Sequence, residues 1–116
     1  MIRLKRIYDE FNEQDGFRIL VDRLWPRGIK KEGAHINLWL KELGPTNELR
    51  KWFNHDPEKW QEFKRRYQAE LSLKKDLLHE IRKAEKENKV VTLLYGARDT
   101  EHNQAVVIAG MLGKHA

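Results

Sequence analysis

The sequence of 116 residues has no cysteine, only three prolines and no long hydrophobic run. Without cysteine there is no disulfide, no thiolate nucleophile and no cysteine-based zinc site. The longest apolar stretches, residues 90–95 and 105–112, are far shorter than the roughly 18 to 20 residues of a membrane span. Residues 1–8 have the pattern of a strand, not of a signal peptide. We therefore expect a cytoplasmic protein with no membrane partner.

The usual signatures of metal and nucleotide sites are also missing. The five histidines show no paired ligand spacing, and no Asp or Glu completes a recognisable ligand set. The glycines Gly28 and Gly33 are too sparse for a phosphate-binding loop between a strand and a helix. We expect neither a metal nor a cofactor.

The composition is that of a folded, globular chain with a heavily solvated surface. It is 40% hydrophobic and 35% charged, and four Trp, four Phe and three Tyr need burial. The length suits one core, so we expect a single α/β domain over residues 1–116. The net charge of +5 could attract acidic partners, but basic and acidic residues alternate through 58–66, which is typical of a solvated helix face.

The first half of the chain predicts two strands and two short helices. Alternating apolar residues predict a strand from Ile2 to Asp9, and a nearly continuous apolar centre predicts a second strand over 17–24. A basic loop follows. Residues 36–43 suggest a short helix that ends before Gly44-Pro45, and Thr46 can cap another that runs through Phe53.

The second half predicts helix, strand and helix. Asp56-Pro57 is a good helix start, and apolar residues at helical spacing follow it. The sequence permits one helix or two over residues 57–88. Val90 to Tyr95 reads as a buried strand, after which Asp99 or Thr100 can cap a last helix.

The strands beginning at Phe17 and Val90 are strongly apolar and separated by mostly helical sequence, the pattern of parallel neighbours. The fold class is therefore α/β, a small three-layer or two-layer domain with a mostly parallel sheet and several packed helices. The carboxyl ends of these strands should share one edge, where open α/β sheets bind ligands.

That edge would gather most of the candidate site residues. Asp22 is the candidate base, and Tyr95 could donate its hydroxyl; these two are the catalytic candidates. The ligand-binding candidates are Arg23, Arg27 and Arg98, which suit a phosphate or carboxylate at a helix start, and Trp25.

Each of these candidates also has a structural reading. Asp22 could be half of a buried ion pair with an arginine that only fixes local geometry. Trp25 could plug the core, and Tyr95 could be an ordinary packing residue with a satisfied hydroxyl. The sequence leaves these alternatives open.

Residues 15–28, DGFRILVDRLWPRG, closely resemble the signature of the YeaO-like family, domain of unknown function 488. The resemblance continues over essentially the whole chain, through LRKWF at 49–53, Phe63 to Tyr67, and TLLY at 92–95 with Asn103. It implies a compact α/β fold in a bacterial-type cytoplasm and draws attention to residues 22–27. It adds Asn103 to the ligand-binding candidates but supplies no reaction.

The start of the last helix departs from the pattern of the broader group. In the resemblance, longer relatives of the broader group carry a Cys-His pair at the positions of Asn103 and Gln104 in this chain. YeaO-like members commonly carry His directly after the Asn, where this chain has Gln104. Glutamine forms hydrogen bonds but cannot shuttle protons at neutral pH, so Gln104 argues against a mechanism that needs an imidazole there.

Three functions remain open. The leading hypothesis is a binding or catalytic site for a small anionic ligand at the sheet edge. The second is a nucleic-acid-binding module that uses the basic loop with Arg27, Lys30 and Lys31, although no recognition motif supports it. The third is a non-catalytic scaffold or homodimer, for which tryptophans could supply an exposed anchor. Whether the protein is an enzyme is not decided by the sequence.

Overall fold

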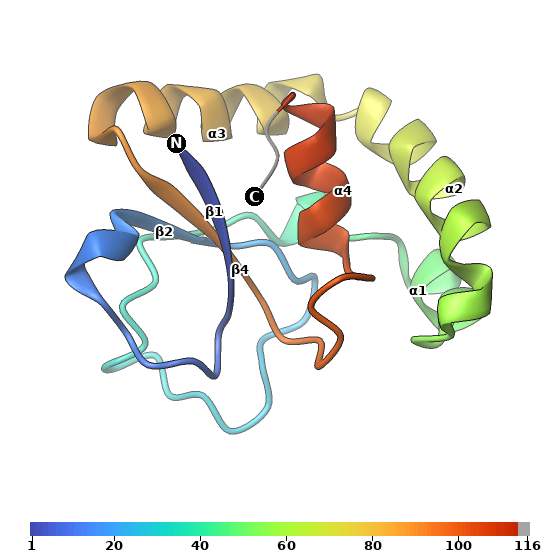
Figure 1. The fold of residues 1–116 in the computed structure, drawn as a ribbon, viewed down its shortest axis with the longest axis horizontal. Helices are drawn as coiled ribbons and strands as arrows, with labels where there is room; N and C mark the ends of the chain where they lie inside the picture. The colour runs from blue at the N-terminus through green and yellow to red at the C-terminus, as the bar shows by residue number, and fades with distance from the viewer. Residues whose placement is uncertain (114–116) are drawn as a thin grey trace.

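The computed structural model describes residues 1–113, which form a parallel sheet with helices packed on it (Figure 1). The strands are β1 (Ile2–Arg6), β2 (Phe17–Leu20), β3 (Leu38–Trp39) and β4 (Val91–Tyr95). The helices are α1 (Asn47–Phe53), α2 (Trp60–Ser72), α3 (Lys75–Asn88) and α4 (Gln104–Met111), with short 3-10 helices at Glu13–Asp15, Lys41–Leu43 and Pro57–Lys59. Within the described residues, no helix is long and apolar enough to cross a membrane.

The sheet has the order β1-β4-β2-β3, and each strand is parallel to its neighbour. β4 pairs with β2 in the register Phe17 to Val91, which confirms that these two apolar strands are parallel neighbours. All five residues of β4 are buried because it lies between β1 and β2 and is covered on both faces. This burial explains its continuous apolar pattern.

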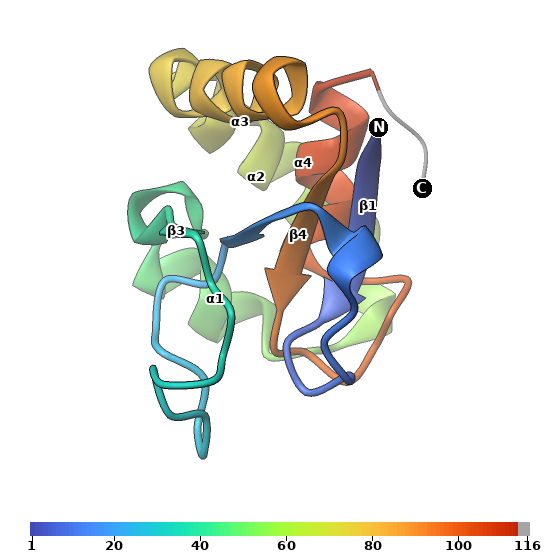
Figure 2. The same cartoon turned by 90° about the vertical axis from the view of Figure 1, so that its left-hand side faces the viewer.

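The two faces of the sheet are covered differently (Figures 1 and 2). Ile19 and Leu93 face the main core, which contains the buried residues of all four helices. Leu20 and Leu94 alternate to the other face, where they pack with Ile7 under side chains of the segment 25–39, which is mostly loop. The fold is therefore a small α/β domain with its helices on one face of the sheet.

Several local signals act as the sequence predicts. The Thr46 hydroxyl accepts a hydrogen bond from Leu49 N and caps α1. Asp56 caps the short 3-10 helix that leads into α2, and Tyr67 lies on the buried stripe of α2. Residues 57–88 form two helices, α2 and α3, because the chain turns at Leu73 and Lys74.

One predicted helix and three boundaries differ from the sequence predictions. The predicted helix over 36–43 is wrong: these residues form β3 and a 3-10 helix, because Leu40 N donates to Leu20 O at the open edge of β2. The strands β1 and β2 end earlier than predicted, at Arg6 and Leu20. The last helix is capped by Asn103, whose side chain accepts from Val106 N, and not by Asp99 or Thr100.

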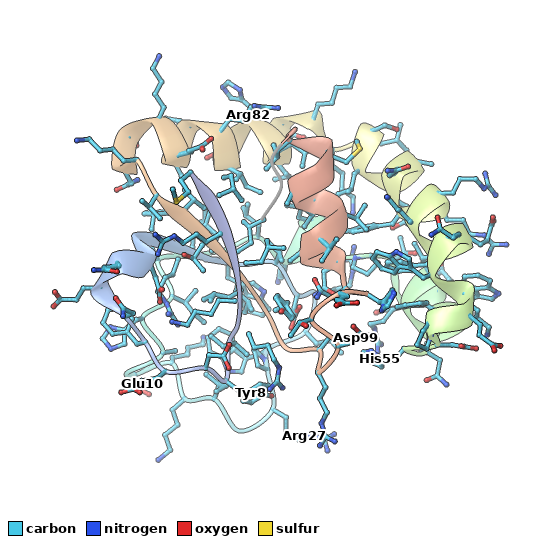
Figure 3. All side chains as sticks on the ribbon, viewed as in Figure 1. Tyr8, Glu10, Arg27, His55, Arg82 and Asp99 are labelled. Carbon is cyan, nitrogen blue, oxygen red and sulfur yellow. The ribbon has the colours of Figure 1, made fainter. Side chains whose placement is uncertain are left out.

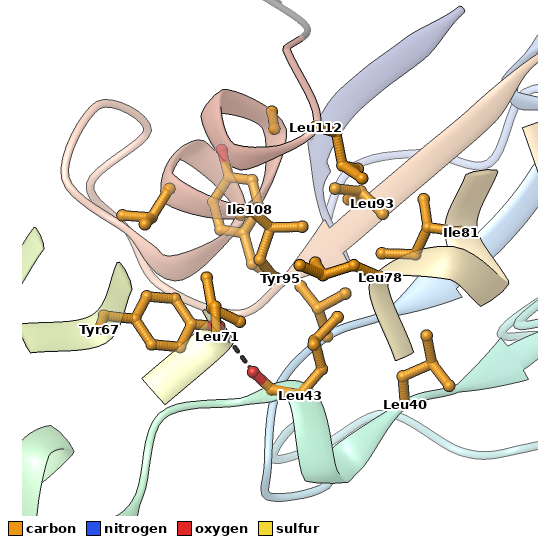
Figure 4. Packing of buried hydrophobic residues seen from close by; sticks show 14 of the residues in the cluster. Leu40, Leu43, Tyr67, Leu71, Leu78, Ile81, Leu93, Tyr95, Ile108 and Leu112 are labelled. Atoms are coloured by element: carbon orange, nitrogen blue, oxygen red, sulfur yellow. Dashed lines mark hydrogen bonds between the residues drawn. The ribbon is translucent and has the colours of Figure 1, made fainter. Parts of the chain in front are cut away.

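The core contains one buried hydroxyl whose value to stability can be measured. Tyr67 Oη donates to Leu43 O at 2.7 Å, and both residues are fully buried (Figure 4). We expect Tyr67→Phe to lower the free energy of unfolding by about 1 to 2 kcal/mol, because a buried carbonyl loses its partner. Urea denaturation measures this. Tyr8→Phe is the matched control, since its hydroxyl bonds to Arg27 O on the exposed surface. Equal effects of the two changes would contradict the prediction.

Candidate functional site

A cavity of about 650 Å³ opens at the carboxyl edge of the sheet. Its walls are the segments that follow β1, β2 and β4, together with the end of α1 and the adjoining side of α2. Tyr8, Arg27, His55 and Asp99, labelled in Figure 3, mark its surroundings beyond the strand ends. This is the edge at which parallel sheets place their ligands. A smaller cavity of about 190 Å³ lies under the loop near Arg18 and Gly33.

Asp22 lies in the cavity wall and is half-buried. Its Oδ2 accepts from Gly96 N at 2.8 Å, and its Oδ1 accepts from Gln104 Nε2. Burial raises the pKa of Asp22 from 3.8 to about 6, and the hydrogen bond from Gly96 opposes this rise. The carboxyl is therefore mostly ionised at neutral pH but needs little energy to take a proton.

Asp22 has no basic partner among the described residues. No ion pair reaches its carboxylate, and its two donors are a backbone amide and a neutral side-chain amide. The structure therefore does not support the alternative in which Asp22 is half of an ion pair with an arginine. Gly96 leaves room for this arrangement, because a Cβ at that position would lie 2.9 Å from Asp22 Oδ2.

Arg23 lines the same cavity but is engaged in holding the chain. Its Nε and Nη2 donate to the carbonyl oxygens of Pro45 and Gly44, at 2.8 and 2.9 Å, and its Nη1 lies 3.7 Å from a Glu42 carboxylate oxygen. The guanidinium thus ties the segment after β2 to the turn before α1. Two of its five N–H donors are used in hydrogen bonds and the charge is partly paired with Glu42, so Arg23 is less available to a ligand than an unpaired arginine.

Three other arginines in the cavity wall are free. Arg27, Arg50 and Arg98 are exposed, and their side chains make no hydrogen bond or ion pair with the described residues. Arg27 and Arg98 are predicted site residues, whereas sequence reasoning missed Arg50. Arg50 stands in the LRKWF stretch at 49–53 of the family resemblance, but only the packing of α1 beside the sheet edge brings it to the cavity.

Trp25 lies between the cavity and the smaller core cluster, and its ligand-binding role stays a prediction. It lines the cavity, and it also packs edge-on against Trp39 in the smaller core cluster. Its Nε1 donates to Ile29 O at 2.6 Å, which fixes the indole and closes the loop after β2. Trp25 therefore offers the cavity a rigid apolar wall and no free donor.

Tyr95 and Asn103 lie in the interior beside the cavity. Tyr95 belongs to the main core, is 3% exposed and is not among the residues that line the cavity. Burial is the main cause that raises its pKa, so the hydroxyl keeps its proton. Asn103 lines the cavity but is 2% exposed; its Nδ2 donates to Asp99 O and its Oδ1 caps α4. The catalytic role of Tyr95 and the ligand role of Asn103 stay predictions.

Sequence reasoning missed a histidine in the cavity wall. His102 Nδ1 lies 2.8 Å from Asp99 Oδ2, and the ring packs edge-on against Trp60. Asp99 also accepts from the amides of Glu101 and His102, and these bonds hold its pKa below the usual value. The spacing of an Asp three residues before a His was the available signal. The pair organises the turn that leads into α4.

The groups behind the other two hypotheses differ in how far they are engaged. The basic-loop residues Arg27, Lys30 and Lys31 are exposed, and Lys31 Nζ lies 5.8 Å from the Trp25 ring centroid. Two further basic residues, Arg65 and Arg66, are paired on another surface. Arg65 and Arg66 both bind the Glu62 carboxylate on the surface of α2. Trp60 is a core residue, and Trp52 is half-buried, with the guanidinium of Arg66 4.3 Å from its ring centroid. In the part of the chain that the structure describes, no group of three or more His, Cys, Asp or Glu could hold a metal ion.

Fold and site together define a small parallel α/β protein with a basic, partly apolar cavity at the carboxyl edge of its sheet. The chain belongs to the DUF488-N3i family, described as the inactive DUF488-N3 subclade, whose model matches residues 1–116. It is 42% identical over 111 residues to uncharacterized protein YeaO of Escherichia coli K12, covering 96% of each chain. It is 40% identical over 111 residues to uncharacterized protein Rv3073c of Mycobacterium tuberculosis H37Rv, covering 96% of this chain and 92% of that one. No solved structure gives a significant match.

Proposed function

We propose that the protein binds a small anionic ligand, carrying a phosphate or carboxylate, in the cavity at the carboxyl edge of the sheet. The observation that carries this proposal is the convergence of Arg27, Arg50 and Arg98 on one cavity, where none of their side chains has a hydrogen-bond or ion-pair partner among residues 1–113. Free guanidinium groups bind carboxylates and phosphates through paired, charge-assisted hydrogen bonds. The cavity wall has four arginines and only two aspartates, so its field favours a negative ligand.

We further propose that binding occurs without chemical turnover. The start of α4 carries Asn103 and Gln104, neither of which titrates at neutral pH, and Asn103 is used as the helix cap. The family to which the chain belongs is described as inactive, which supports the same conclusion. Asp22, half-buried in the cavity wall, has the raised pKa that a base would need, but its neighbours in the hydrogen-bond network are amides.

Titration calorimetry with inorganic phosphate tests the binding proposal. We expect Arg98→Gln and Arg50→Gln each to weaken phosphate binding by about tenfold, because each removes a charge-assisted hydrogen bond. Arg65→Gln is the matched control, since Arg65 lies on the surface of α2 and pairs with Glu62. Phosphate binding that is absent, or that falls equally in the control, would exclude the cavity as an anion site.

A further inference from the structure

The cavity presents two unused hydrogen-bond acceptors at Asp22. A carboxylate has about four acceptor positions, and Asp22 uses two of them, one for Gly96 N and one for Gln104 Nε2. The carboxylate is half-buried in the cavity wall, and no basic side chain of residues 1–113 forms an ion pair with it. A buried anion of this kind is stabilised by a ligand that brings N–H donors.

Gln104 adds a donor next to these acceptors. Its Nε2 carries two hydrogens, one of which bonds to Asp22 Oδ1, and the second has no acceptor among the described residues. At Asp22 and Gln104 Nε2 the wall of the cavity therefore offers one donor beside two acceptors, while Gln104 Oε1, which has no donor among the described residues, is on the other side of the same amide. A complementary ligand would present one acceptor beside two donors on a single edge.

Among the common nucleobases, only guanine has that edge. Its O6 accepts, while its N1–H and its 2-amino group both donate. Adenine and cytosine each place a ring-nitrogen lone pair beside their amino group, and that lone pair would face the carboxylate of Asp22. Uracil has a single N–H between two carbonyl oxygens. Adenine, cytosine or uracil bound at this edge would each place a hydrogen-bond acceptor opposite the Asp22 carboxylate, which is also an acceptor. Two acceptors that face each other weaken binding.

The rest of the cavity suits the rest of a nucleotide. Trp25 provides a rigid apolar wall, and two of the exposed large apolar side chains of the protein, Tyr8 and Leu24, lie in the lining. The volume of about 650 Å³ falls in the range of roughly 300 to 1,000 Å³ that is typical of small-molecule sites. The free arginines supply the charge that a phosphate needs.

We infer that the ligand of this cavity is a guanine nucleotide, with the guanine edge on Asp22 and Gln104 and the phosphate on the arginines. The inference rests on the proposed anion-binding function and deepens it. Asp22 and Gln104 then determine which base is accepted, whereas Arg50 and Arg98 supply affinity for any nucleotide.

The test is titration calorimetry of the full chain at about pH 8 with guanosine, inosine and adenosine monophosphates and with ribose 5-phosphate. Inosine monophosphate lacks only the 2-amino group, so we expect it to bind about tenfold more weakly than guanosine monophosphate. We expect adenosine monophosphate and ribose 5-phosphate to bind more weakly still.

Two variants test whether Asp22 and Gln104 recognise the guanine base. Asp22→Asn should bring guanosine and inosine monophosphates to similar affinity, because one acceptor is replaced by a donor. Gln104→Met should weaken both equally, since both carry O6. Asp76→Asn, a change of an exposed carboxylate on α3, is the matched control and should alter neither. Urea denaturation of each variant checks that it is folded.

The outcomes separate this inference from the proposed function. If all four ligands bind equally and Arg98→Gln weakens all of them, anion binding stands and the guanine inference is overturned. If inorganic phosphate binds and no nucleotide does, the inference is again overturned. If neither phosphate nor any nucleotide binds, both proposals fail.

Discussion

Arg18→Met should lower the free energy of unfolding by about 3 to 5 kcal/mol, the range for breaking a buried ion pair by removing one partner. Arg18 is 2% exposed and its Nη1 lies 2.5 Å from Asp15 Oδ2. Its other nitrogens donate to His35 O and Ala34 O. Removing the guanidinium leaves the Asp15 carboxylate buried and releases the loop that Arg18 holds against the sheet.

The Asp15 carboxyl makes this prediction dependent on pH. Burial raises its pKa, but hydrogen bonds from Lys5, Asn12 N and Arg18 more than offset the rise, so the pKa lies below 3.8. A carboxyl with a lowered folded pKa stabilises the protein above its unfolded pKa and loses this contribution as the pH falls through the folded value. The loss in free energy of unfolding caused by Arg18→Met should therefore be largest at neutral pH and become smaller below about pH 3.8.

Urea denaturation at neutral and acid pH measures both effects. Arg3→Met is the matched control, because Arg3 is exposed and donates only to Gln14 O and the Met1 sulfur. We expect that control to change stability by less than about 0.5 kcal/mol. If Arg18→Met cost no more than the control, the buried pair would not stabilise the fold.

Asp22→Asn should raise the free energy of unfolding at about pH 8, by up to about 3 kcal/mol, and leave it nearly unchanged at about pH 4. The folded pKa of Asp22 is about 6, against an ordinary value of 3.8, so folding is disfavoured by ionisation. Below about pH 3.8 Asp22 is protonated in both states and does not lower the free energy of unfolding. The decrease in that free energy grows between pH 3.8 and pH 6 and is complete above pH 6. Asparagine removes the charge and keeps the shape.

The hydrogen-bond network can accommodate this substitution. An asparagine at position 22 would accept from Gly96 N through its oxygen, and its amide nitrogen would donate to the Gln104 oxygen once that side chain turns over. Asp76→Asn, on the exposed face of α3, is the control and should show no such difference between the two pH values. A loss of stability at about pH 8 in Asp22→Asn would mean that a cation holds the carboxylate, contrary to the structure.

The strands and most helices could be predicted because their signals are local. The continuous apolar run of β4 reflects burial on both sides, and the caps Thr46 and Asp56 mark helix starts by their own side chains. The helix predicted over 36–43 failed because two residues pair with the open edge of β2, and that edge is known only in the folded sheet. The cap of α4 is Asn103 and not Asp99 for a similar reason. The Asp99 carboxylate accepts from the amides of Glu101 and His102 and so holds the turn that precedes the helix.

The sequence by itself determined the family, the parallel pairing of the two apolar strands and the edge that gathers Asp22, Arg27 and Arg98. The family follows from the sequence motif, the strand pairing from the pattern of apolar residues, and the shared edge from the parallel direction of the two strands. Only the tertiary structure decided what each polar group contacts. It left Asp22 with two amide donors and, among the described residues, no ion-pair partner; it also engaged Arg23 with carbonyl oxygens and brought Arg50 to the cavity. The physical reason is that hydrogen bonds and close ion pairs form only when their atoms lie within a few ångströms, and such distances between residues remote in the sequence are set by packing.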